Sequence, residues 1–598
     1  MRKKFYLILI TTFLIVSLLS LTSCISSQNT SDAGSEKVIR ILATSDMHGY
    51  FVQYDYFSNT AVSTGAGANV VSAISELRND NTIVVDAGDL IQDNYADLFL
   101  DDDIHPMASL LNIAKYDAWV TGNHEYNYGM DNLLKFRDSI DAPLLLGNVS
   151  KDGQSIGKNY IILERDGVKI ALIGVVTPNI TAWDSANLQG WDVENPIDTV
   201  KKAIEEIGDS ADILIGVFHM GLNDELYVKG SGVNSIAAEC DELDFIIAAH
   251  DHNAFTDYTE NGIPVVANKN HGETMIMSDL TVIKDENGKY ILKNAVSEII
   301  DTANYEPSFE LLEATKAQDS KAKEEANRII GTIKSQLIST DAATGLCTVC
   351  MGDSCWMQFL SDCLRYYSDA DVISAAPTLG DKTLNGGNIT NADIAKIAYY
   401  NNNTLYKLQF TGKQLKMYME YVADFYNQFN EGDLTVSYNK NWRFYNFDTF
   451  DGVNYEIDIS KPVGERIVNL TWPYGTPVQD DDVLTLATSN YRANSCLLKP
   501  GIIFEEDDLP ILLESDVAGN IGGYQQLISY YIQNELNGEI EPYCDNNWSL
   551  TGIDRDEDLY NRALDLIANG QIQIVNTEDG RQANIESITE EQVRAFIK

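Results

Sequence analysis

Residues 38–49 read Val-Ile-Arg-Ile-Leu-Ala-Thr-Ser-Asp-Met-His-Gly, a short apolar run that ends in polar residues and a glycine. Similar short runs rich in Val, Ile and Leu follow at 82–85, 118–120, 144–146, 169–176, 212–218, 245–249 and 264–267. They lack clean alternation of apolar and polar residues, which is typical of strands covered on both faces. Helix-like stretches lie between several of them, at 68–78, 106–113 and 196–207. The pattern predicts a layered α/β domain through about residue 300.

Polar residues close these runs in a regular way. The first run ends in Asp46-Met47-His48, the second in Gly88-Asp89, the third in Gly122-Asn123-His124-Glu125, the sixth in His219 and the seventh in His250-Asp251-His252. Five of the seven histidines therefore lie at strand ends, where α/β sheets gather functional residues. Carboxylate, imidazole and amide oxygen are ligands suited to Zn²⁺, Mn²⁺ or Fe. Taken singly, each piece has a structural alternative, such as a turn, a cap or a buried histidine.

Together and in this order, the motifs resemble those of the calcineurin-like metallophosphoesterases. The resemblance implies two divalent metal ions, Zn, Mn, Fe or similar. One would be held by Asp46, His48 and His252, the other by Asn123, His219 and His250, with Asp89 bridging them. Such a pair clamps a phosphoryl group and activates water. His124 would face the phosphate as the acid or as a stabiliser of charge in the transition state.

Two positions depart from the pattern of that family. Ala249 replaces the usual glycine before the last histidine pair, and Asn127 stands where many 5′-nucleotidases have an acidic residue that orients the catalytic histidine. An asparagine can position an imidazole, but it cannot offset the imidazole's charge. We therefore place Asn127 with His124 in the catalytic site and expect a different acid-base balance there.

Over nearly the whole mature chain, the sequence resembles the 5′-nucleotidase family. Within it, the 2′,3′-cyclic-nucleotide 2′-phosphodiesterase/3′-nucleotidase branch is most similar, through stretches such as 122–129, 445–448 and 490–493. The resemblance implies an N-terminal α/β metallophosphoesterase domain, a layered β-sandwich flanked by helices, and an α+β C-terminal domain that binds the nucleoside. That family sandwiches the base between two aromatic rings, and the matching residues are Tyr445 and Tyr491. Asn494-Ser495-Cys496 replaces the usual Gly-Gly pair beside them, and the G-G-x-I-R stretch of 5′-specific enzymes is absent.

The N-terminus has the charged and apolar regions of a secretory signal, Met1-Arg2-Lys3-Lys4 followed by an apolar stretch to Leu21. Leu21-Thr22-Ser23-Cys24 resembles a lipobox, in which the cysteine carries the lipid. We expect an exported lipoprotein anchored through Cys24 to the outer face of the bacterial cell membrane, or in the periplasm. An ordinary signal peptide or a signal anchor is the alternative.

Composition changes along the chain, read together with the family resemblance, divide it into five parts. They are a signal peptide (1–24), a flexible tether rich in Ser, Asn, Gly and Asp (25–36), the metallophosphoesterase domain (37–302), a charged linker helix (303–335) and the substrate-binding domain (336–598). Because the substrate would bridge the two domains, residues near the linker helix are candidates for a hinge.

The charge balance limits the partners. With 89 acidic and 42 basic residues, the net charge of −47 repels a nucleic acid backbone, so polymeric DNA or RNA is a poor partner. Small phosphorylated substrates are compatible with this charge if metal ions reverse the local field. The sequence thus predicts a monomeric hydrolase of nucleotides or cyclic nucleotides that serves nucleotide scavenging. A 5′-nucleotidase or UDP-sugar hydrolase is one alternative, and a nucleotide-binding surface lipoprotein with little activity is another.

Overall fold

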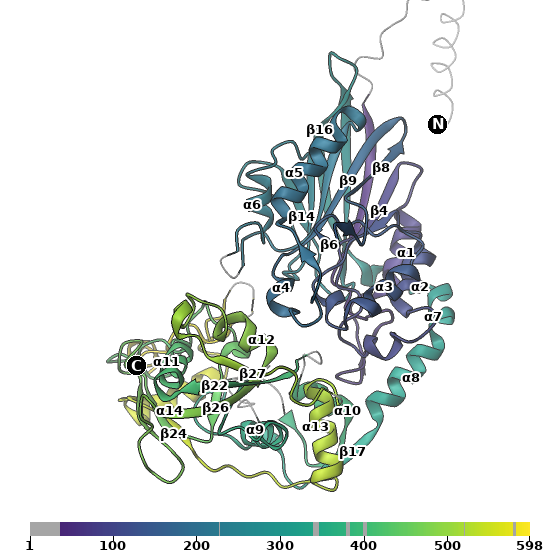
Figure 1. The fold of residues 1–598 in the computed structure, drawn as a ribbon. Coiled ribbons are helices and arrows are strands. Elements are labelled where there is room, and N and C mark those ends of the chain that lie inside the picture. The colour runs from purple at the N-terminus through teal and green to yellow at the C-terminus, as the bar shows by residue number, and fades with distance from the viewer. Residues whose placement is uncertain are drawn as a thin grey trace, which may run out of the picture.

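The computed structural model describes residues 36–225, 228–338, 346–377, 383–398, 403–519, 521–577, 580 and 582–597. The predicted signal peptide, with Cys24, and residues 25–35 of the predicted tether lie outside this part of the chain. Figure 1 shows two bodies joined by helices that run along the outside of the molecule. Within the described residues, no helix combines the length and apolarity that a membrane span requires.

Two sheets packed face to face form the N-terminal domain. The first has the order β16-β15-β1-β4-β5, with bounds Tyr290–Asp301, Thr274–Lys284, Lys37–Thr44, Thr82–Asp86 and Ala118–Trp119. The second has the order β13-β14-β12-β11-β9-β8, with bounds Phe255–Tyr258, Pro264–Ala267, Phe245–Ala248, Ile213–His219, Val168–Val176 and Tyr160–Arg165. Strand β1 is parallel to β4 and antiparallel to β15. The predicted layered β-sandwich with flanking helices is confirmed.

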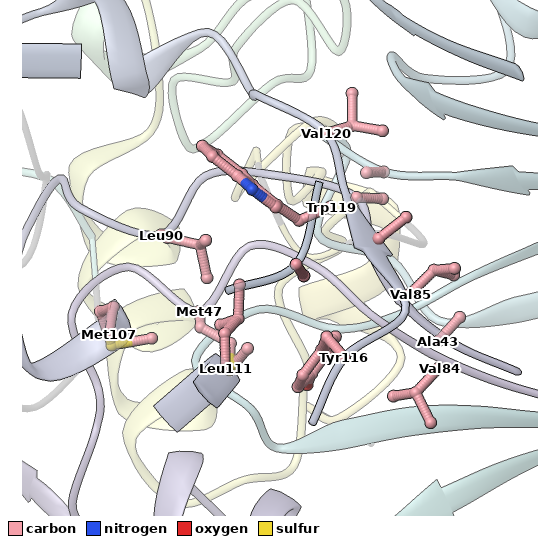
Figure 2. Close-up of a cluster of buried hydrophobic side chains, with 14 of the residues drawn as sticks. Ala43, Met47, Val84, Val85, Leu90, Met107, Leu111, Tyr116, Trp119 and Val120 are labelled. Carbon is pink, nitrogen blue, oxygen red and sulfur yellow. The ribbon is translucent and has the colours of Figure 1, made fainter. Parts of the chain in front are cut away.

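The central strands are buried on both faces, as their lack of alternation predicts. In β9, Ile170 and Leu172 pack into the core between the sheets, whereas Ala171 and Ile173 pack against helix α5, Pro196–Ile207. On the first sheet, apolar side chains of β1, β4 and β5 join those of α2, Pro106–Ala114, in one cluster (Figure 2). This core fixes the strand ends from which the polar loops emerge. The run at 144–146 forms only isolated bridges.

Short elements connect and cover these sheets. The helices are α1 (Gly67–Leu77), α3 (Met130–Asp138), α4 (Ile180–Trp183) and α6 (Val233–Ala237), and the small strands are β2 (Tyr54–Asp55), β3 (Thr60–Ala61), β6 (Val149–Lys151), β7 (Gln154–Ser155) and β10 (Asp192–Val193).

The linker differs from the single helix predicted over 303–335. It consists of α7, Phe309–Ala314, and α8, Lys316–Asn327, followed by strand β17, Ile329–Ile333. Strand β17 reads Ile-Ile-Gly-Thr-Ile. Its β-branched side chains favour a strand, which pairs with β21, Gly387–Thr390. Helix α8 touches both domains, because Tyr56 donates a hydrogen bond to Asp319 and Asn391 donates one to Glu325.

The C-terminal domain is an α+β body with its own core. Its main sheet has the order β23-β19-β26-β22-β27, with bounds Thr449–Asp451, Val372–Ala375, Val483–Ser489, Leu405–Thr411 and Ile511–Glu514. The helices that pack in this domain include α9 (Cys355–Ser368), α10 (Asn391–Ile397), α11 (Gly412–Ala423), α13 (Tyr524–Tyr530) and α14 (Glu557–Ala568). Strand β26 leads directly into α12, Asn490–Arg492, which continues into the π-helical turn Ala493–Leu497.

Candidate metal centre

All seven predicted metal ligands lie at the ends of strands from the two sheets of the N-terminal domain. Asp46 and His48 follow β1, Asp89 follows β4, Asn123 follows β5, His219 ends β11, and His250 and His252 follow β12. Five of them have left-handed backbone, with φ of 52° at Asp46, 45° at His48, 59° at Asp89, 76° at His250 and 58° at His252. Non-glycine residues rarely adopt this conformation, and it costs on the order of 1–3 kcal/mol each. Such strain concentrates at functional sites.

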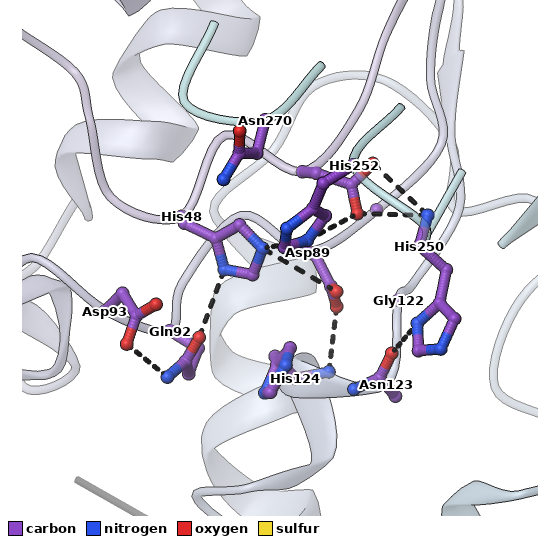
Figure 3. A network of polar contacts seen from close by, with 12 residues as sticks. His48, Asp89, Gln92, Asp93, Gly122, Asn123, His124, His250, His252 and Asn270 are labelled. Carbon is purple, nitrogen blue, oxygen red and sulfur yellow. Dashed lines mark hydrogen bonds and ion pairs between the residues drawn. The ribbon is translucent and has the colours of Figure 1, made fainter. Parts of the chain in front are cut away.

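The first group of ligand atoms comes from Asp46, His48, Asp89 and His252, which can all present an atom within 4.8 Å of one another. His48 Nε2 lies 3.0 Å from His252 Nε2, and the latter lies 3.6 Å from Asp46 Oδ1. Figure 3 shows His48, Asp89 and His252 converging. Burial lowers the pKa of His48 to about 3, so this imidazole is neutral and keeps a lone pair for a metal ion.

The second group comes from Asp89, His219 and His250, joined by the amide oxygen of Asn123. Asp89 Oδ2 lies 3.1 Å from His219 Nε2, and Asn123 Oδ1 lies 3.1 Å from that same nitrogen and 2.8 Å from His250 Nδ1. Asp89 belongs to both groups, as the predicted bridging role requires.

The residues fit a pair of cations. Among the described residues, none forms a hydrogen bond with Asp89 Oδ2, although this oxygen is buried and His219 Nε2 is 3.1 Å away. A buried carboxylate oxygen without a partner is costly unless a positive charge lies beside it. Burial lowers the pKa of His219, but the neighbouring Asp89 more than offsets this and raises the pKa to about 10. The site thus favours a cation beside Asp89, and carboxylate, imidazole and amide oxygen suit divalent ions.

Outer partners fix which nitrogen of each ring faces the centre. His48 Nδ1 lies 3.0 Å from Gln92 Oε1, and His219 Nδ1 lies 2.6 Å from the carbonyl oxygen of Ala87. Both partners are acceptors, so each ring donates its Nδ1–H outward and turns Nε2 towards the centre, where a metal ion would take the place of the proton that Asp89 favours on His219 Nε2. His250 Nε2 lies 3.1 Å from Glu225 Oε2, which leaves its Nδ1 towards Asn123. The sequence pattern alone does not predict these roles of Gln92 and Glu225.

Two glycines and a glutamate hold the Asp89 loop against the Asn123 loop. A β-carbon at Gly88 would lie 2.2 Å from the backbone nitrogen of Gly122, and one at Gly122 would lie 2.0 Å from Asp89 Oδ1. The buried Glu125 carboxylate accepts hydrogen bonds from the backbone N–H groups of Asp89, Leu90 and Gly122, at 2.9, 2.6 and 2.5 Å. The glycines therefore allow the close approach, and Glu125 fastens it.

His124 stands beside the centre with its own support. Its backbone N–H donates to Asp89 Oδ1 at 2.8 Å, and its Nδ1 lies 2.7 Å from Asn127 Oδ1. The structure thus brings together the two residues predicted for catalysis. It also reveals a further partner, because Asn127 Nδ2 donates to both carboxylate oxygens of Asp184, at 3.1 and 3.2 Å.

A cavity of about 510 Å³ connects the metal centre to the C-terminal domain. Its walls include His124 and His250 on one side and Tyr445, Tyr491 and Tyr524 on the other. The buried hydroxyl of Tyr524 has no hydrogen-bond partner among the described residues. One continuous space therefore reaches from the metal ligands to the predicted base site.

Tyr445 and Tyr491 lie next to each other at this cavity, but they do not form an open slot. Their ring centroids are 6.3 Å apart and their planes meet at 76°, an edge-to-face arrangement. A base sandwiched between two rings needs the rings nearly parallel, so one ring has to turn before a base can enter. The Asn494-Ser495-Cys496 departure forms part of the π-helical turn, and Asn494 Nδ2 lies 3.5 Å from Ser185 Oγ of the N-terminal domain.

Comparisons with known families match both halves of the chain. Residues 39–254 match the calcineurin-like phosphoesterases, and residues 329–497 match the 5′-nucleotidase C-terminal domain. These ranges cover the metal ligands and both tyrosines. Calcineurin-like phosphoesterases use two divalent metal ions, in agreement with the two groups of ligands.

Relatives align along most of the chain. The 2′,3′-cyclic-nucleotide 2′-phosphodiesterase/3′-nucleotidase of Salmonella typhimurium is 29% identical over 599 residues, which cover 87% of this chain and 89% of that protein. The trifunctional nucleotide phosphoesterase protein YfkN of Bacillus subtilis is 28% identical over 617 residues, which cover 91% of this chain and 41% of that protein. The chain thus spans less than half the length of the second relative.

A solved structure shares the complete fold. The putative 5′-nucleotidase from Staphylococcus aureus superposes with a TM-score of 0.73 at 20% identity, over 86% of this chain and 100% of that one. The protein is therefore a hydrolase with the two-domain fold of the 5′-nucleotidases, in which a calcineurin-like phosphoesterase domain precedes a 5′-nucleotidase C-terminal domain.

Proposed function

We propose that this protein is an exported nucleotide phosphohydrolase that opens 2′,3′-cyclic nucleotides and then removes phosphate from the resulting 3′-nucleotides. The observation that carries the proposal is the single cavity that joins the metal ligands to Tyr445 and Tyr491. A nucleotide can place its phosphate at one end of this cavity and its base at the other. The Salmonella typhimurium relative, aligned over most of both chains, is named for this pair of reactions.

The chain's own residues supply the positioning and the proton. Asp46, His48 and His252 would hold one ion, and Asn123, His219 and His250 the other, with Asp89 shared. When bound, the two ions supply Lewis acidity towards the phosphoryl oxygens and towards water. His124 lines the cavity next to Asp89 and donates a proton to the leaving nucleoside oxygen. In the first reaction water adds to phosphorus and the P–O2′ bond breaks, which leaves the 3′-phosphate. In the second, water adds again and the P–O3′ bond breaks, which releases inorganic phosphate.

One feature of the cavity favours 3′- and cyclic nucleotides over 5′-nucleotides. Among the described lining residues, Arg492 is the only arginine, and its Nε lies 2.6 Å from Asp448 Oδ2 in a buried ion pair. The Arg492 guanidinium is thus paired with a carboxylate of its own domain. Residues 387–390, in the stretch that would carry a phosphate-binding arginine in 5′-specific enzymes, form strand β21 and do not line the cavity.

The test is phosphate release from 3′-AMP, 5′-AMP, UDP-glucose and 2′,3′-cyclic AMP, each with Mn²⁺, with Zn²⁺ and with chelator. We expect metal-dependent turnover of 3′-AMP and 2′,3′-cyclic AMP, with a kcat/KM at least tenfold above that for 5′-AMP and UDP-glucose. A preference for 5′-AMP or UDP-glucose would indicate a 5′-nucleotidase or a UDP-sugar hydrolase. A metal-loaded protein that binds nucleotides and hydrolyses none would indicate a nucleotide-binding surface lipoprotein.

Export and lipid anchoring are part of the same proposal. They are supported by the apolar stretch from 5 to 21 and the lipobox-like tetrapeptide ending in Cys24. An exported enzyme of this specificity would serve nucleotide scavenging. Labelling cells with a radioactive fatty acid should mark the wild-type protein and leave Cys24→Ala unlabelled. Equal labelling of both proteins would contradict the anchor.

A further inference from the structure

His124 is held by a chain of hydrogen bonds through two residues, one more than the sequence pattern indicates. Asn127 lies between the imidazole and a carboxylate: His124 Nδ1 is 2.7 Å from Asn127 Oδ1, and Asn127 Nδ2 is 3.1 and 3.2 Å from the two oxygens of Asp184. An amide accepts through its oxygen and donates through its nitrogen. It can therefore pass a hydrogen bond from the ring to a carboxylate one residue further away.

Both oxygens of the Asp184 carboxylate accept from the Asn127 amide. Asp184 is 7% exposed, and within the described part of the chain no lysine or arginine forms an ion pair with it. Asn187, from the next turn, donates to the backbone oxygens of Tyr126 and Asn127, at 3.0 Å each. The segment that carries Asp184 is thereby fastened to the segment that carries His124 and Asn127.

The neighbours of Asp184 place it between the metal centre and the C-terminal domain. The Trp183 ring stacks on His250, with centroids 5.5 Å apart and planes at 21°, and Ser185 Oγ lies 3.5 Å from Asn494 Nδ2. Three consecutive residues therefore contact a metal ligand, the support of His124 and the turn that follows Tyr491 and Arg492.

We propose that Asp184 is a positioning residue that orients His124 through Asn127 and supplies the carboxylate that position 127 lacks. The inference rests on the proposed role of His124 as the proton donor. A hydrogen bond to an anion is about twice as strong as one to a neutral group, so Asp184 polarises the Asn127 amide and strengthens its hold on the ring. It acts on the step in which the leaving oxygen takes a proton.

Steady-state kinetics with two leaving groups tests this role. A nucleoside oxygen needs a proton as it departs, whereas p-nitrophenolate leaves without one. We expect Asp184→Asn to lower kcat for 3′-AMP by about 10- to 100-fold, the usual effect of losing such an outer partner. KM for 3′-AMP and kcat for p-nitrophenyl phosphate should stay within about threefold of wild type, since neither depends on the proton. Asp198→Asn, an exposed substitution in the first turn of α5, is the matched control.

Exchanging the two side chains provides the rescue. In the double variant Asn127→Asp, Asp184→Asn, the carboxylate contacts the ring directly and the amide donates to it from behind. We expect this variant to recover most of the 3′-AMP activity lost in Asp184→Asn. Asn127→Asp alone places two carboxylates in contact and should lower kcat for 3′-AMP, because the second charge is uncompensated.

The outcomes separate the inference from the proposed function. If the wild-type protein hydrolyses 3′-AMP and Asp184→Asn keeps the wild-type kcat, the inference alone is overturned. Equal losses on both substrates, or an inactive double variant, would also overturn it when the variant melts at the wild-type temperature. A wild-type protein that hydrolyses no nucleotide would overturn the proposed function and the role of Asp184 with it. Thermal melting of each variant identifies a loss of fold, which would also appear as equal losses on both substrates.

Discussion

The backbone of Gly122 lies directly against the carboxylate of Asp89, so that a β-carbon at position 122 would stand 2.0 Å from Asp89 Oδ1 and 2.5 Å from the Asp89 backbone nitrogen. The metal centre depends on this approach, because Asp89 belongs to both groups of ligands. The glycine in the Gly-Asn-His-Glu motif thus has a steric reason, independent of its backbone angles.

The first prediction follows from this contact. Gly122→Ala should displace Asp89 and lower phosphate release from 3′-AMP on the order of 100-fold, since a shift of about 1 Å in a catalytic group has an effect of this size. Metal analysis should find less than the wild-type content. Gly352→Ala, where a β-carbon meets nothing within 4 Å, is the control. Wild-type turnover and metal content in Gly122→Ala would contradict the steric account.

The second prediction concerns the aromatic pair at the far end of the cavity. Stacking on a base is worth about 1–3 kcal/mol, so Tyr491→Ala should raise KM for 3′-AMP by about 5- to 150-fold. Tyr491→Phe keeps the ring and should stay near wild type. Kinetics on p-nitrophenyl phosphate, which has no base, should not change in either variant. If Tyr491→Ala leaves KM for 3′-AMP unchanged, the base does not bind there.

The third prediction concerns stability. Arg492 and Asp448 form a buried ion pair, and Tyr418 also donates to Asp448 at 2.8 Å. Arg492→Ala removes the cation and leaves the carboxylate buried, which should cost about 3–5 kcal/mol of folding free energy. Urea denaturation would show this as a lower midpoint. Arg594→Ala breaks the exposed pair with Glu590 and should cost at most about 1 kcal/mol. Equal small effects for both variants would contradict the account.

The sequence predicts the strands, and the polar residues that the structure gathers at their ends, because both depend on local pattern. Each ligand directly follows or ends an apolar run, and parallel strands such as β1 and β4 bring their carboxyl ends to one edge. The linker was less predictable. The polar, charged character of α8 does not indicate that this helix ends at Asn327, or that Ile329–Ile333 forms a strand that pairs with β21.

The supporting residues could not be found from the sequence. Glu125 lies within a recognised motif, but its four hydrogen bonds to backbone N–H groups depend on how two loops meet. Asp184 is 57 residues from Asn127, and no spacing rule links them. The edge-on arrangement of Tyr445 and Tyr491 likewise depends on the packing of two separate segments.

The most direct test of the account is the number of metal ions bound by the wild-type protein and by Asp89→Ala, measured by mass spectrometry of the metals after reconstitution and desalting, together with phosphate release from 3′-AMP. The account predicts two ions per wild-type chain, fewer than two in Asp89→Ala, and a loss of turnover in the variant. Two ions and wild-type turnover in Asp89→Ala, or full turnover of the wild-type protein after its metals are removed, would contradict it.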